Sequence, residues 1–132
     1  MDRELTRPGG TQSGAAVVDF VLVGGLLSVL FVALVQFAVV LHVRNVLVDC
    51  ATEGARYGAL ADRDAEAGAN RTRELIAADL SASYARAVEA TVRTDGGLSL
   101  VEVRISAPLP VAGLLGIGRV ITVSGHSVSE AP

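Results

Sequence analysis

An apolar run from Ala15 to Leu41 constrains this chain more than any other feature, because it contains a single charged residue, Asp19. At about 1.5 Å of rise per residue, a helix over this run is roughly 40 Å long and can cross a hydrocarbon layer of about 30 Å. The run therefore predicts a transmembrane helix over residues 15–41. A carboxylate in such a helix costs insertion free energy, which makes Asp19 a candidate functional residue.

The residues before Asp19 form a recognisable motif. Asp19 is the fifth residue when Ala15 is counted as the first, and Phe20 continues the apolar helix at once. Residues 1–14, MDRELTRPGGTQSG, are polar and contain Gly and Pro, so we expect a disordered and accessible leader. The pattern resembles a class III signal peptide. This resemblance implies that a prepilin peptidase cuts between Gly14 and Ala15 on the cytoplasmic side and leaves the helix attached.

Two other kinds of N-terminal segment share part of this pattern. An ordinary secretory signal peptide fits worse, because its apolar region should span about 7–15 residues and end at an A-x-A site. An uncleaved signal anchor stays open as the alternative, because a glycine and an acid at this spacing also arise by chance. The two remaining interpretations differ in whether the leader is removed.

Composition limits the part of the chain that lies beyond the apolar run. The chain has 132 residues, a net charge of -3 and one cysteine, Cys50. Only about 90 residues come after the membrane run, which is enough for one modest domain. The acidic balance excludes a basic surface for nucleic acid. A single cysteine excludes an internal disulfide, so Cys50 is interpreted as a small packing residue or as half of an intermolecular bridge.

Helical periodicity continues beyond the membrane run and predicts a helical stalk over residues 42–61. Cys50, Gly54 and Gly58 recur at a spacing of four and form a ridge of small side chains on one helix face. Such a ridge allows another helix to approach closely. The partner is either a later helix of this chain or a helix of a neighbouring subunit, and the sequence leaves both open.

Three features together resemble the TadE-like family: the glycine with an acid five residues on, the Asp19-Phe20 pair, and ATEGAR at residues 51–56. That family comprises minor pilins or pseudopilins of the tight-adherence (Flp) pilus system. The resemblance implies a single-pass protein of the cell membrane, with the N-terminus cytoplasmic and the C-terminal domain extracytoplasmic. The implied partners are the membrane, a prepilin peptidase, other pilin-like subunits and the pilus assembly machinery. It also implies that Asp19 and Phe20 act in assembly, with Asp19 meeting the free amine of Ala15 on a neighbouring mature subunit.

Residues 62–132 predict a small α+β head of one helix and a roughly three-stranded antiparallel sheet. Within residues 61–87, Asn70 is the expected N-cap of a helix that starts at Arg71. A change to alternating periodicity after residue 88 predicts a hairpin that turns at TDGG, residues 94–97. The next strand is expected at residues 119–129, with Gly125 as a bulge.

The remaining features predict no catalysis. The two histidines, His42 and His126, lie far apart in sequence and show no metal-ligand spacing, and no nucleophile elbow is present. We therefore expect no enzyme activity, no metal and no cofactor. The segment over residues 108–118 is unusually apolar for a loop. It is expected either to fold over the sheet or to contact the membrane or a neighbouring subunit.

Overall fold

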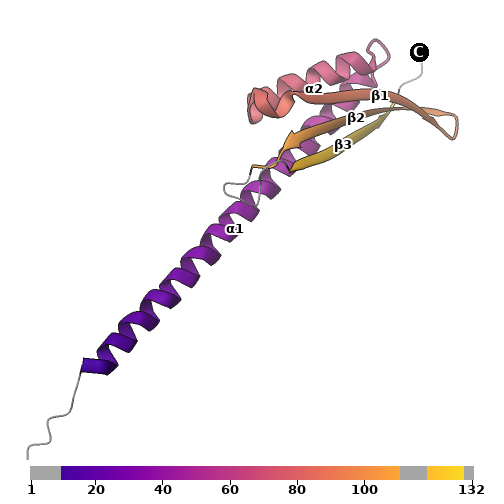
Figure 1. Ribbon diagram of the computed structural model, residues 1–132. Helices are drawn as coiled ribbons and strands as arrows, with labels where there is room; N and C mark the ends of the chain where they lie inside the picture. Colours follow the sequence, from indigo (N-terminus) through magenta and orange to yellow (C-terminus); the bar gives the residue numbers. More distant parts are fainter. Residues whose placement is uncertain (1–9, 111–118, 130–132) are drawn as a thin grey trace, which may run out of the picture. The chain divides into compact units, whose positions relative to one another are not determined.

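The computed structural model describes residues 10–110 and 119–129 and divides the chain into two compact units, Met1–Val35 and Gln36–Pro132. The elements in chain order are α1 (Gly10–Gly58), α2 (Ala65–Asp79), the 3-10 helix η1 (Ala82–Ala85), β1 (Ala87–Asp95), β2 (Leu98–Pro108) and β3 (Val120–Val128). Figure 1 shows them along the chain. The predicted α+β class is confirmed: a long apolar helix, a second helix and a three-stranded antiparallel sheet.

The first unit is helical over its described residues, which begin at Gly10. Residues 10–14 were expected to lack regular structure as part of the leader, and the structure differs here. Thr11, Gln12 and Ser13 tolerate helical geometry, and each residue added to an existing helix gains a hydrogen bond without a new nucleation cost. The apolar helix therefore continues backwards past Ala15. Residues 1–9 lie outside the described part of the chain.

The second unit is a head built around the C-terminal part of α1. The largest fully buried side chains of its core come from α1, α2 and β2: Leu47, Ile76, Ile105, Val101, Val103 and Thr72. Val43, Ala51 and Ala55 of α1 join the same core cluster. The helix that leaves the apolar run thus supplies one wall of the head, and the head cannot form its core without it.

Helices α1 and α2 approach each other through glycine. A Cβ atom added to Gly58 would lie 2.8 Å from the Asp64 carbonyl oxygen and 3.1 Å from the Gly68 Cα. A Cβ atom on Gly54 would meet the Thr72 hydroxyl. That hydroxyl donates a hydrogen bond to the Gly68 carbonyl (2.9 Å), so it has little freedom to move away. Gly54 and Gly58 therefore contact α2 of the same chain, and a contact of the ridge with a neighbouring subunit stays a prediction.

The N-terminus of α2 differs from the prediction. Asp64 is its N-cap: the backbone there is extended, and Oδ1 accepts a hydrogen bond from the Ala67 N–H at 2.8 Å. Asn70, the predicted cap, lies inside the helix, where its Oδ1 accepts a hydrogen bond from Arg73. Glycine usually weakens a helix, but Gly68 lies within α2 because the close contact with Gly58 leaves no room for a side chain.

The sheet has the order β1-β2-β3, with both neighbouring pairs antiparallel. The predicted hairpin is confirmed: β1 and β2 are joined at Gly96 and Gly97, whose φ angles of 58° and 86° suit a two-residue hairpin turn. The predicted bulge at Gly125 is wrong, because the register of β2 with β3 is unbroken and Gly125 pairs with Val103. Gly125 is instead needed where β3 crosses the backbone of α1 at Ala51.

The apolar segment 108–118 is described in part. Pro108 ends β2, and the next residue, Leu109, donates a backbone hydrogen bond to the Arg119 carbonyl at 3.0 Å. Residues 111–118 lie outside the described residues, so the two contacts proposed for this segment stay predictions.

Substituting Gly58→Ala tests the glycine contact. Alanine favours a helix by ~1 kcal/mol over glycine, but its Cβ would press on backbone atoms that cannot rotate away. Overpacking of this kind costs about 1–3 kcal/mol, so we expect a net loss of head stability. Thermal unfolding followed by the fluorescence of the two tyrosines, Tyr57 and Tyr84, measures it. Gly24→Ala is the control, because a Cβ there meets nothing within 4 Å, and it should not lower the melting temperature.

Candidate functional site

The described part of the chain has one helix long and apolar enough to cross a membrane, over Thr11–Gly58, with a mean hydropathy of 2.6 in its most apolar window. None of that window is buried against other parts of the protein. Large apolar side chains are exposed along it, including Phe20, Phe31 and Phe37. Such a surface is unfavourable in water and suits lipid or other apolar helices.

Asp19 is exposed on the first unit of α1. Its neighbours one turn away are Ala15, Ala16, Leu22 and Val23, and none of these can donate a side-chain hydrogen bond. Within the described residues, the Asp19 carboxylate has no hydrogen bond or ion pair. In an apolar layer this group therefore needs a donor or a cation from another molecule.

The predicted cleavage position lies one helical turn before Asp19. Gly14 and Ala15 are both exposed, and a Cβ atom at Gly14 would meet nothing within 4 Å. The peptide bond between them lies inside α1, after the fifth residue of the helix, Gly14. A peptidase that needs an extended substrate would have to unwind the first turn and part of the second, at the end of the helix, where helices fray.

The predicted packing residues lie away from this region, in the head. Cys50 is 3% exposed, and Gly54 and Gly58 are buried against α2. The Thr72 hydroxyl lies 3.5 Å from the Cys50 carbonyl oxygen, within the same helix contact. Cys50 is a free cysteine in the core cluster.

A polar cluster on the outer face of the sheet was not predicted from the sequence. Its centre is Glu102, whose side chain is 5% exposed although it points away from the core. Oε1 accepts a hydrogen bond from Arg104 Nη2 at 2.9 Å, and Oε2 lies 2.8 Å from Arg93 Nε. The second contact is an ion pair without hydrogen-bond alignment, so Oε2 accepts no hydrogen bond within the described residues. His126 Nε2 lies 3.8 Å from Oε1.

This cluster connects the three strands, because Arg93, Glu102 and His126 belong to β1, β2 and β3. The hydrogen bond from Arg104 lowers the pKa of the Glu102 carboxyl, and the nearby charges of Arg93, Arg104 and His126 lower it further, against the opposing effect of burial. The sequence contained one signal for the cluster: the two arginines fall on the same face of the hairpin as Glu102. The structure is needed to show that Glu102 is covered.

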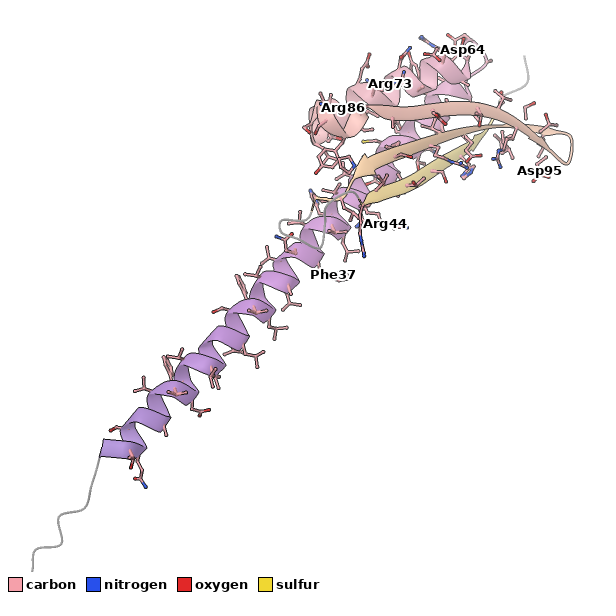
Figure 2. The ribbon with its side chains drawn as sticks, viewed as in Figure 1. Phe37, Arg44, Asp64, Arg73, Arg86 and Asp95 are labelled. Carbon is pink, nitrogen blue, oxygen red and sulfur yellow. The ribbon has the colours of Figure 1, made fainter. Side chains whose placement is uncertain are left out.

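The other residues with possible chemistry are dispersed. His42 is exposed on α1, while His126 is on β3 beside Glu102. Across residues 10–110 and 119–129, no group of three or more His, Cys, Asp or Glu side chains could hold a metal ion. Four acids of the head, Glu53, Asp62, Asp64 and Glu66, are exposed, and Asp64 also caps α2 (Figure 2).

An exposed apolar helix with one acid near its start, followed by a small α+β head, defines a protein anchored by a single membrane helix. The family model described as TadE-like protein matches residues 14–56. This match confirms the resemblance to the TadE-like family over residues 14–56, which are 43 of the 132 residues of the chain. The family consists of structural pilus subunits rather than enzymes. No curated protein and no solved structure matches the chain.

The Glu102 cluster makes the stability of the head depend on pH. The pKa of the Glu102 carboxyl is lower in the folded head than in the unfolded chain. The stabilising effect of the ionised carboxylate is therefore complete above the ordinary glutamate pKa, near 4.3, and disappears as pH falls through the lower folded value. We expect Glu102→Gln to lower the melting temperature at pH 7 and to have a smaller effect at pH 3. Glu89→Gln, an exposed acid on the same face, is the matched control and should change little at either pH.

Proposed function

We propose that this protein is a pilin-like minor subunit that takes part in assembling a tight-adherence pilus or a related secretion apparatus. The observation that carries the proposal is where the TadE-like match begins: at Gly14, the residue before the proposed cut. The match continues through the apolar helix and ends at Arg56, after Gly54 in the head. The match therefore covers both the processing motif and the part of α1 that packs in the head.

Asp19 and the new N-terminus of Ala15 are the proposed assembly pair. Cleavage after Gly14 leaves a free amine at Ala15, which carries a positive charge near neutral pH. Within the described residues of its own chain, the Asp19 carboxylate has no partner. Burying it unpaired among apolar helices is costly. An amine from the adjacent subunit supplies the missing charge. Phe20, 78% exposed beside it, supplies apolar contact area for the same neighbour.

The proposal implies an arrangement in the cell. The leader is cytoplasmic, where a prepilin peptidase removes it, and the head lies on the far side of the membrane. The charges that flank the helix do not decide this orientation, since Arg3 and Arg7 are balanced by Asp2 and Glu4. The domain divisions proposed are a leader at residues 1–14, a span at 15–41, a stalk at 42–61 and a head at 62–132.

The alternative function is an uncleaved single-pass anchor whose head binds an envelope partner. An anchor keeps its leader, has no Ala15 amine and makes no use of Asp19, so the two functions predict different N-termini and different effects of substitution at Asp19.

The cleavage prediction is tested by N-terminal analysis of the protein extracted from membranes of cells that contain the peptidase. We expect the chain to begin at Ala15. Gly14→Arg should leave the leader attached, because a long charged side chain replaces the small residue next to the cut. Gly10→Arg introduces the same charge four residues earlier and should still be processed. A wild-type chain that retains Met1 or Asp2 would support the anchor instead.

The assembly prediction compares two substitutions at one position. Asp19→Ala removes the counter-charge for the neighbouring amine, so co-purification with other pilin-like subunits should fall. Membrane insertion should improve slightly, because an unpaired carboxylate no longer enters the bilayer. Asp19→Glu keeps the charge and should retain assembly. If Asp19→Ala assembles as well as the wild type while cleavage is normal, the proposed pairing is wrong and the processing proposal is unaffected.

A further inference from the structure

One end of the head lies next to the end of the apolar run. This end can be located within the second unit alone, because that unit includes residues 36–41, the last part of the apolar run. Beyond Leu41, α1 continues through residues 42–58 as part of the head. At about 1.5 Å of rise per residue, residues 42–45 lie within roughly 6 Å, along the helix, of the point where the apolar run ends.

Helix α2 leads back toward this end. Gly58 of α1 lies against Gly68, near the start of α2, and Gly54 lies against Thr72, one turn further along α2. The two helices are therefore antiparallel, and α2 ends beside the part of α1 that enters the head from the apolar run. The 3-10 helix η1 and the start of β1 follow directly in the chain.

The sheet brings two further strand ends to the same place. Ala87, at the start of β1, pairs with Ser106 of β2, and Ser106 pairs with Thr122 of β3. The start of β1, the end of β2 and the start of β3 therefore lie side by side. Figure 1 shows these strand ends where α1 enters the head, and the hairpin turn at the opposite end of the sheet.

The adjoining segments form a basic end of the head. Its described residues, 36–48, 80–88, 105–110 and 119–123, contain Arg44, Arg86 and Arg119 but no aspartate or glutamate. At the far end of the head, residues 57–66 and 93–99 contain more acids than bases: Asp62, Asp64, Glu66 and Asp95 against Arg63 and Arg93. Charge is thus separated along the head, with the positive end next to the apolar run.

The three arginines of the basic end are free to bind another molecule. Each is exposed, and none forms a side-chain hydrogen bond or an ion pair within the described residues. Figure 2 shows Arg44 on α1 beside the ends of β2 and β3, and Arg86 at the start of β1. Five other arginines of the head do form ion pairs: Arg63, Arg71, Arg73, Arg93 and Arg104.

We propose that Arg44, Arg86 and Arg119 dock the basic end of the head on anionic phospholipid headgroups of the bilayer that holds the apolar run. Headgroups form the layer directly outside the hydrocarbon core, so Arg44, three residues beyond Leu41, reaches them at any tilt of the span. Guanidinium groups bind phosphate oxygens through charge-assisted hydrogen bonds. A bilayer is favoured over an acidic protein because the apolar run brings this end to the membrane surface in every copy of the protein.

The proposal does not depend on cleavage of the leader or on which side of the membrane the head lies. It is tested with the full-length protein in phosphatidylcholine bilayers that contain a trace of spin-labelled lipid. Electron paramagnetic resonance distinguishes lipid held at the protein from lipid in the bulk bilayer. We expect spin-labelled phosphatidylglycerol to associate more strongly than spin-labelled phosphatidylcholine, by about fivefold for each arginine that reaches a headgroup. Salt at about 0.5 M should remove most of this preference.

Substitutions assign the preference to the basic end. Combining Arg44→Gln, Arg86→Gln and Arg119→Gln should make the two lipids associate almost equally. Lysine at the same three positions keeps the charges and should retain the preference. Arg56→Gln is the matched control, because Arg56 is also an exposed arginine of α1 but lies about 18 Å further from the apolar run than Arg44. It should retain the preference.

Equal association of the two lipids with the wild type would overturn the proposal and favour an acidic protein as the occupant. A preference that survives the triple glutamine substitution would place the lipid contact elsewhere. A preference lost equally in Arg56→Gln would reflect net charge rather than this surface. Tyrosine fluorescence during thermal unfolding shows whether each variant folds. If the triple variant does not fold, Arg44→Gln alone decides, and an unchanged preference in that variant would contradict the proposal.

Discussion

The structure depends on direct backbone contact between α1 and the rest of the head. Gly58 and Gly68 allow α1 to touch α2, and Gly125 allows β3 to cross α1 at Ala51. At each point a side chain would occupy space already filled by backbone atoms of the facing element. These contacts lie in the C-terminal part of α1, the helix that also carries the apolar run.

The elements that could be predicted are those whose signals are local in the sequence. Apolar length, helical period and the hairpin turn at Gly96 and Gly97 are local signals, and each led to the observed element. The cap at Asn70 was wrong because Asp64 and Asn70 can both cap a helix, and tertiary contact decides where α2 starts. The bulge at Gly125 was wrong for a related reason: glycine in a strand indicates a bulge or a close approach, and sequence alone does not distinguish them.

The candidate sites show the same division. Gly14 and Asp19 are proposed from spacing because the chemistry assigned to them is local to one helix. Glu102 could not, because its burial depends on Arg93 from the neighbouring strand and on Arg104 from its own. The two carboxylates are opposites in this respect. Glu102 forms ion pairs with Arg93 and Arg104 inside the chain, whereas Asp19 lies in an apolar helix and has no partner within the described residues. The carboxylate without a cation is the one that indicates an intermolecular role.

Pairing between Asp19 and the Ala15 amine of a neighbouring subunit is the central claim. Zero-length carbodiimide cross-linking of assembled subunits, followed by mass spectrometry, tests it directly because the reagent joins a carboxylate to an amine only when the two are in contact. The account predicts a peptide in which the Asp19 carboxyl is amide-linked to a mature N-terminal amine. The absence of that linkage, in material where other carboxylates have reacted and Ala15 is the N-terminus, would contradict it.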